Sequence, residues 1–191
     1  MLWTQLEPQS GLCTAQATGV LISMASPLAG SVSFYRTVEQ PRAHAMVETF
    51  AALEQVPSHA GIVRACQGSG CVRHLCIEVA DDIKELEPAP VLMVVAFRVP
   101  QAHCTQVDEW YECEHAPLLL KADGWLRARR YHGFISHGDE PWTHVALHDL
   151  RELAVLDSKE RAVARSTAWR ARLCAESWFQ QAGRWIYERL A

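Results

Sequence analysis

The sequence lacks the hydrophobic and basic segments that direct proteins to membranes. No stretch reaches the roughly 18–20 apolar residues that a membrane-spanning helix needs, and the longest candidate is Val91–Phe97 with its flanks. The first positively charged side chain is Arg36, so no basic segment precedes an apolar run as in a secretory signal. We therefore expect a cytoplasmic protein with no membrane partner.

Common catalytic and cofactor motifs are also absent. The chain has no glycine-rich phosphate loop, GxSxG elbow or HExxH sequence, and Gly68-Ser-Gly70 is typical of a hairpin turn. The seven cysteines include no CxxC pair, and the spacing of Cys66, Cys71 and Cys76 matches no standard zinc knuckle. We expect reduced thiols, no metal site and no nucleotide cofactor.

Charge is too evenly mixed for a nucleic-acid-binding protein. The chain has 18 basic and 22 acidic residues, a formal net charge of −4, and counterion release needs clustered cations. Residues 123–191 are a weak exception, with 11 Lys or Arg against 9 Asp or Glu. The 191 residues, 49% of them hydrophobic, suffice for one large domain or two small ones with a real core.

The second half of the chain predicts a β-α-β-β-α-β order, which is a ferredoxin-like unit. Val91–Val99 is β-branched and lies between two prolines, as in a buried strand. Thr105 is a candidate N-cap for a helix that reaches Lys121 and ends or kinks near Pro117. The other expected elements are a strand over Trp125–His132, a turn over Gly133–Asp139, a strand over Trp142–Leu150, a helix over Asp157–Cys174, and a strand or helix end over Arg184–Leu190.

The first half resembles the second at four points in the same order, which indicates a duplicated unit. The paired landmarks are Val20–Ala25 with Val94–Val99, Phe34-Tyr35 with Trp110-Tyr111, Gly61 with Gly124, and His74 with His144. Two units can bury the bare faces of their sheets against each other. We therefore predict an α+β fold of two fused ferredoxin-like units, residues 1–88 and 89–191, forming a pseudo-dimeric α/β barrel.

The second unit resembles a known family. Its Trp110-Tyr111-Glu-Cys-Glu114-His115-Ala-Pro117 segment, followed by Gly124-Trp-Leu-Arg-Ala-Arg129-Arg130-Tyr131, resembles the motifs of EthD-like dimeric α/β-barrel proteins. Ser166-Thr-Ala-Trp169-Arg170 is similar to the second helix of that group. The resemblance implies a pocket between the helices and the sheet. It also implies a cofactor-free cyclase, decarboxylase, dehydratase or isomerase, a monooxygenase of activated aromatic compounds, or a haem enzyme.

The sequence departs from the family pattern in two places. Glu39 and Gln40 stand where the first unit would carry its counterpart of Glu114-His115, and Asp123 stands where the family often has proline. The first departure indicates a single competent site, in the second unit.

His115 and Tyr111 are the candidate catalytic residues. A neutral imidazole can take or give a proton near pH 7, and Tyr111 precedes His115 by one helical turn. Tyr111 could donate a hydrogen bond to a developing enolate oxygen. The alternatives are a histidine that bonds the backbone at a helix end and a tyrosine that packs in the core.

Candidate substrate-binding residues come from the strands and the aromatic positions. The guanidinium of Arg129 could hold a carboxylate or phenolate, although such residues often pair with acidic neighbours instead. Four further residues could line an aromatic cleft or merely pack in the core: Trp110, Trp125, His144 and His148. His144 and His148 lie about 13 Å apart along one strand, too far to share one metal ion.

Together these residues predict a cofactor-independent lyase, isomerase or cyclase. It would transfer a proton on a small hydrophobic substrate, an aromatic or polyketide-like carbonyl compound, with a homodimer as a further possibility. The alternatives are a haem-binding or cofactor-free oxidative enzyme on the same fold, and a non-catalytic small-molecule-binding or assembly protein.

Overall fold

The computed structural model describes residues 2–6, 32–38, 47–51, 71–86, 89–137 and 142–189. The chain forms two compact units. The first comprises Met1–Ile77, His132–Pro141 and Ile186–Ala191, and the second comprises Glu78–Tyr131 and Trp142–Trp185. The division of a duplicated chain at residue 88 stays a prediction.

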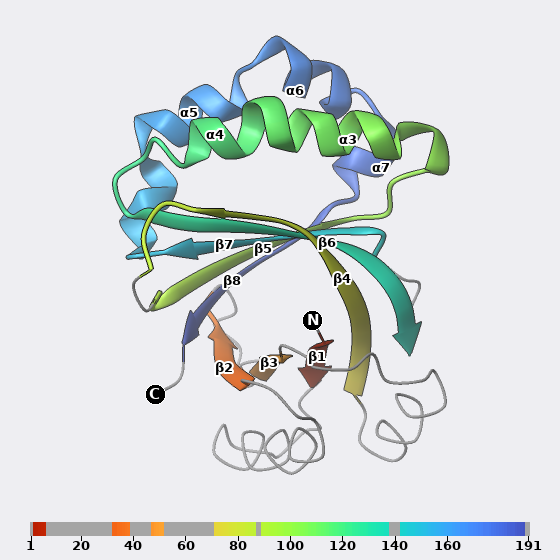
Figure 1. The fold of residues 1–191 in the computed structure, drawn as a ribbon, viewed down its shortest axis with the longest axis vertical. Helices are drawn as coiled ribbons and strands as arrows, with labels where there is room; N and C mark the ends of the chain where they lie inside the picture. Colours follow the sequence, from red (N-terminus) through yellow and green to blue (C-terminus); the bar gives the residue numbers. More distant parts are fainter. Residues whose placement is uncertain are drawn as a thin grey trace. The chain divides into compact units, whose positions relative to one another are not determined.

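The second unit follows the predicted β-α-β-β-α-β order (Figure 1). Helices cover one face of an antiparallel sheet in which the strand order is β8-β5-β7-β6-β4. The α+β class and the ferredoxin-like arrangement are therefore confirmed for this unit. Its strands are β4 (Cys71–Ile83), β5 (Val91–Phe97), β6 (Trp125–His137), β7 (His144–Leu150) and β8 (Gly183–Arg189), of which β4, β6 and β8 also contribute residues to the first unit.

Strands β5 and β7 form the centre of the sheet. They pair antiparallel from Val91 opposite Leu150 to Phe97 opposite His144, and every residue in both strands is buried. A strand buried on both faces reads as a continuous apolar run rather than an alternating one, as β5 does. The same register places His148 opposite Met93 on the face that β5 presents through Met93, Val95 and Phe97.

The first helical segment is continuous but changes its geometry three times. It consists of η1 (Gln101–His103), α3 (Cys104–Trp110), the π-helical turn η2 (Tyr111–His115) and α4 (Ala116–Leu119). The predicted N-cap at Thr105 is wrong, because the chain leaves its extended conformation at Pro100 and coils from Gln101 onward. The helix ends two residues before Lys121 and accommodates Pro117 in its last turn.

The second helical segment is broken, whereas a single helix over Asp157–Cys174 was expected. After η3 (Leu153–Asp157), α5 (Lys159–Arg165) and α6 (Ala168–Cys174) are separate helices, followed by α7 (Ser177–Gln180). Thr167 causes the break, since its hydroxyl accepts the Arg170 backbone N–H at 3.2 Å and so caps a new helix. None of the helices in the described ranges has the length and apolar character to cross a bilayer.

Two strand boundaries also differ from expectation. The predicted turn over Gly133–Asp139 is wrong for its first part, because β6 continues to His137. Residues 183–189 form a strand, which settles the choice left open for Arg184–Leu190.

The described part of the first unit consists of strands. β1 (Leu2–Leu6) pairs antiparallel with β3 (Val47–Ala51) and with the start of β4, and β2 (Val32–Thr37) pairs with β3 and the end of β8. Phe34 and Tyr35 lie on β2, so their predicted equivalence to the helical Trp110 and Tyr111 is wrong. Val20–Ala25, Glu39, Gln40 and Gly61 lie outside the described residues, and the duplication stays a prediction.

Gly124, in the turn directly before strand β6, is under a conformational constraint. Its φ is +80°, and a Cβ atom there would lie 2.7 Å from Cγ2 of Val155. We expect Gly124→Ala to lower the free energy of unfolding by about 2 kcal/mol, because both the left-handed backbone and the close contact penalise a side chain. Urea denaturation measures this loss.

Val155→Ala, combined with Gly124→Ala, tests whether the two positions are in contact. Because it removes the methyl group that would clash, the double variant should lose about 1 kcal/mol less than the sum of the two single losses. Strictly additive losses would contradict a contact between the two positions.

Candidate functional site

A cavity opens between the helices and the sheet of the second unit. Its empty space is about 460 Å³ with the open mouth included. Apolar and aromatic side chains form most of the wall: Met93, Val95, Phe97, Trp110, Leu119, Trp125 and Phe179. The polar lining consists of Tyr111, His115, His148, Arg161, Arg165, Arg170 and Arg184.

The π-helical turn sets the positions of the motif side chains. The Ala116 N–H donates to the carbonyl of Tyr111, five residues earlier. An α-helix would place residues i and i+5 about 140° apart, whereas here Trp110 stacks on His115 with ring centroids 4.2 Å apart. Tyr111 meets His115 edge to face at 5.2 Å. Single π-turns within helices occur often at functional sites.

Three polar atoms of the cavity wall are buried without a hydrogen-bond partner. They are Nε1 of Trp110, Nδ1 of His115 and Nε2 of His148. Buried polar groups are nearly always paired, so each such exception needs an explanation. Three of these exceptions belong to residues of one cavity wall, whereas others, such as Nε1 of Trp178, lie outside it.

Hydrogen bonds on the far side of each ring define which nitrogen carries the proton. The Trp125 indole N–H donates to Nδ1 of His148 at 3.3 Å, so a neutral His148 carries its hydrogen on Nε2. His115 makes a backbone hydrogen bond at Ala164, which leaves its unpaired Nδ1 as a lone pair. The wall therefore presents two N–H donors, Trp110 Nε1 and His148 Nε2, and one acceptor, His115 Nδ1.

Burial keeps these groups uncharged at neutral pH. Desolvation lowers the pKa of His115 to about 3, with a further contribution from the charge of Arg170. Desolvation likewise lowers the pKa of His148 to about 3, assisted by His115 and Arg129. Burial raises the pKa of Tyr111 well above its usual range, so its hydroxyl stays protonated and can donate.

The structure brings five of the seven predicted site residues into the cavity wall: Trp110, Tyr111, His115, Trp125 and His148. Arg129 lies elsewhere, where its NH2 group donates to both carboxylate oxygens of Asp149 at 2.8 and 2.9 Å. Arg129 therefore pairs with an acidic neighbour, which was the alternative to its predicted role in binding substrate.

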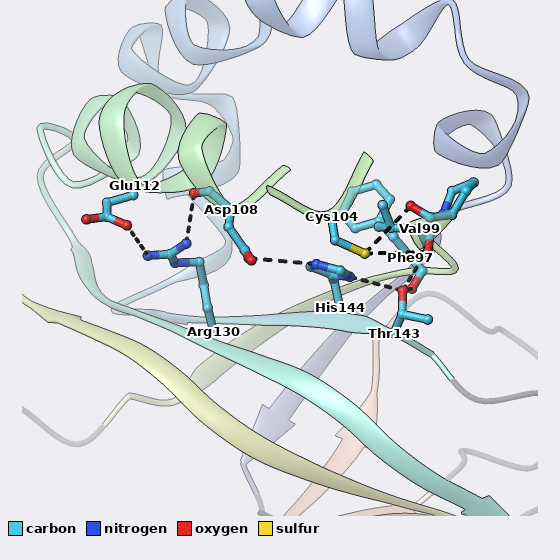
Figure 2. Close-up of polar contacts among 9 residues, drawn as sticks. Phe97, Val99, Cys104, Asp108, Glu112, Arg130, Thr143 and His144 are labelled. Atoms are coloured by element: carbon cyan, nitrogen blue, oxygen red, sulfur yellow. Dashed lines mark hydrogen bonds and ion pairs between the residues drawn. The ribbon is translucent and has the colours of Figure 1, made fainter. Parts of the chain in front are cut away.

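His144 lies in a separate polar cluster next to α3 (Figure 2). Its Nε2 is 3.7 Å from the Asp108 carboxylate, and its Nδ1 is 3.0 Å from the Thr143 hydroxyl. In the same region Arg130 donates to the backbone carbonyl of Asp108 at 3.1 Å. His148 therefore lines the cavity and His144 lies in the polar cluster, although both are on the same face of strand β7.

The four arginines of the wall were not predicted as site residues. Arg161 and Arg165 are one turn apart on α5, Arg170 is on α6 and Arg184 is the second residue of β8. The i, i+4 spacing on α5 and the basic excess of the last third were the available signals. Neither signal indicated that three separate segments meet at one cavity.

Comparisons with known proteins identify the fold. No family model matches the chain, and no curated protein matches it. An anthrone oxidase-like protein superposes with a TM-score of 0.63 at 12% identity, over 100% of this chain and 90% of that one. A ferredoxin-fold protein from Listeria monocytogenes, related to antibiotic biosynthesis monooxygenases, superposes with a TM-score of 0.58 at 7% identity. The match covers 100% of this chain and 95% of that one.

A heme-degrading enzyme from Listeria monocytogenes gives a TM-score of 0.56 at 7% identity, over 98% of this chain and 99% of that one. At such low identities the comparisons show the fold alone. The chain has a ferredoxin-like fold.

The two neutral histidines make stability depend on pH. Their folded pKa values of about 3 lie below the ordinary value of 6.5, so the unfolded chain binds more protons between these limits. Their contribution is present above pH 6.5 and is lost as pH falls toward 3. Each histidine should lower the free energy of unfolding by about 1.4 kcal/mol for every pH unit that the pH falls in that window.

Urea titrations at pH 7, 6 and 5 measure this slope. The double variant His115→Gln/His148→Gln, which cannot take up these protons, should show a shallower decline than the parent protein. Parallel declines would contradict the burial of neutral imidazoles.

Proposed function

We propose that this chain is a cofactor-independent oxidative enzyme that deprotonates an enolisable aromatic carbonyl compound and passes the resulting enolate to dioxygen. The observation that carries the proposal is the set of unpaired atoms on the cavity wall. Two N–H donors and one lone pair complement a carbonyl oxygen and an adjacent acidic C–H group. The aromatic wall suits the ring system of such a substrate.

Each side chain has a defined role in this chemistry. Nδ1 of His115 takes the proton from carbon, while Trp110 and His148 donate to the oxygen on which negative charge develops. Tyr111 supplies a further hydroxyl donor. In the empty cavity His115 is a weak base because the charged imidazolium is desolvated, but an enolate formed beside it stabilises that charge.

The oxidation balances with dioxygen as the co-reactant. Loss of the proton to His115 leaves a carbanion that transfers electrons to dioxygen and forms a C–O bond. The His115 imidazolium then returns its proton to the peroxide anion. Loss of water from the resulting hydroperoxide then converts the CH2 group into C=O. Overall, CH2 and O2 give C=O and H2O.

The comparisons support the oxidative alternative over the lyase or isomerase expected first. The structures with similar folds are named as anthrone oxidase-like, monooxygenase-like and heme-degrading proteins. Proton removal from carbon is common to both reaction types, so His115 keeps its predicted role. EthD-like membership, a cytoplasmic location and a homodimer also belong to this proposal, whereas Arg129 and His144 lie outside its site.

Anthrone is a suitable probe because its methylene group enolises. With it, His115→Gln should lower both anaerobic deuterium exchange at the methylene and aerobic oxygen uptake by about 10²–10⁴-fold, the range for a lost general base. Tyr111→Phe should cost less, because the ring that packs beside His115 remains. Proton NMR and an oxygen electrode measure the two rates.

His103→Gln is the matched control, since His103 is a half-buried histidine outside the cavity wall. It should retain both rates within about twofold. Loss of oxygen uptake with intact exchange would place His115 after the deprotonation step and contradict its role as the base.

Haem binding is a second candidate, favoured by the unpaired Nδ1 of His115 beside four arginines. Nδ1 could coordinate iron, and the arginines could pair with two propionates. Bound haem would supply a metal centre for oxygen chemistry. It would leave the Trp110 and His148 N–H groups without an acceptor, which is why we prefer the enolising reaction.

An absorbance titration separates the two candidates. We expect the broad Soret absorption of free haemin to stay unchanged when haemin is added to the purified protein at equimolar concentration. A sharpened and shifted Soret band that is lost in His115→Ala would replace the cofactor-free proposal with the haem one.

A further inference from the structure

We infer that the substrate carries a permanent carboxylate, and that Arg161, Arg165, Arg170 and Arg184 hold this group at the cavity wall. The inference rests on the proposed function only in taking the same cavity as the binding site. It adds a fixed anion, separate from the carbonyl oxygen on which charge develops during the reaction.

Three chain segments place these arginines around one space. The Ser158 hydroxyl accepts the backbone N–H of Arg161 at 3.3 Å and begins α5. The Thr167 hydroxyl begins α6 by accepting the Arg170 N–H, and it donates to the Glu114 carboxylate at 2.6 Å. The arginine-bearing helix is thus joined directly to the π-turn that carries His115.

The charges of these four arginines are not balanced by carboxylates. Arg170 donates to the backbone carbonyl of Arg165 at 3.0 Å, and Arg161 donates to that of Leu156. Within the described ranges no Asp or Glu forms a hydrogen bond or ion pair with any of the four, and none lines the cavity. Asp157 acts on Arg161 only as a neighbouring charge.

Three arginines elsewhere in the second unit form ion pairs with carboxylates. The partners are Asp81 for Arg127, Asp149 for Arg129 and Glu85 for Arg151. The arginines of the cavity wall differ from these three in having no such partner among the described residues.

The clustering has an electrostatic cost that a bound anion would remove. Arg161 and Arg170 are half-buried, and desolvation together with neighbouring arginines lowers the pKa of each. Guanidinium groups donate in planar forks that match the two oxygens of a carboxylate. Because Arg170 also lies over the Phe179 ring, at 5.7 Å from its centroid, the bound anion would adjoin an aromatic surface.

Equilibrium binding of a matched pair of probes tests this inference. 2-Naphthoate and 2-naphthamide have the same ring system, but only the first is charged. We expect naphthoate to bind the parent protein about 10–100-fold more tightly, the range for charge-assisted hydrogen bonds. Quenching of tryptophan fluorescence, with Trp110 and Trp125 in the wall, reports binding, and calorimetry confirms it.

Substitutions at two arginines of α6 test whether the preference for naphthoate over naphthamide arises at the cavity. Arg170→Gln should remove at least about tenfold of the advantage of naphthoate and leave naphthamide unchanged. Arg172→Gln is the matched control, because Arg172 is exposed on the same helix and does not line the cavity. It should preserve both dissociation constants within about twofold.

Three results would overturn the inference. They are equal affinities for the two probes, an effect of Arg172→Gln as large as that of Arg170→Gln, and no binding of naphthoate at millimolar concentration. Tighter binding of 2-naphthyl phosphate than of naphthoate would replace the carboxylate with a phosphate ester.

The binding test is independent of turnover. Selective binding of naphthoate in His115→Gln, which lacks the base, would sustain the arginine site even if the oxidation reaction failed. Conversely, anthrone turnover with no preference for naphthoate would leave the proposed reaction standing without the fixed anion.

Discussion

The burial of two histidine rings without a carboxylate partner is the constraint on which the cavity depends. A charged imidazolium has no anion to balance it there, so both rings stay neutral. Neutrality then fixes their hydrogen positions, because Trp125 occupies one nitrogen of His148 and the backbone at Ala164 engages one nitrogen of His115. A lone pair on His115 and an N–H group on His148 remain unpaired among the described residues, and the proposed acid–base chemistry uses this asymmetry.

The arginines influence the same histidines from a distance. Arg170 and Arg129 lower the tendency of His115 and His148 to take up a proton, while any anion formed in the cavity is stabilised by that positive field. Thr167 links the two systems mechanically, since it caps α6 and bonds Glu114 in the π-turn. One hydroxyl group thus connects the π-turn that carries His115 with the helix that carries Arg170.

Oxidative and non-oxidative reactions on this fold share a first step. Removal of a proton from carbon needs a base, a donor set for the oxygen and a low-dielectric wall, which are the roles that we propose for residues of the second unit. Whether the enolate then meets dioxygen depends on the substrate more than on the protein, because an electron-rich aromatic enolate reduces oxygen without a metal.

The sequence by itself determined the order of elements in the second unit. An apolar run bounded by prolines, an alternating strand and a helix-compatible stripe are local patterns, and they placed Tyr111 and His115 on one side of a helix. It did not determine the break at Thr167 or the π-turn, because each depends on a contact or a backbone geometry that propensity does not encode.

Tertiary structure alone decided which charges meet. Arg129 finds Asp149 across the sheet, whereas Arg161, Arg170 and Arg184 converge on the cavity from two helices and a strand. The same residue type thus becomes an ion pair in one place and an uncompensated cation in another. The physical reason is that ionic interactions depend on distance through space and on burial, and neither quantity is written in the spacing of residues along the chain.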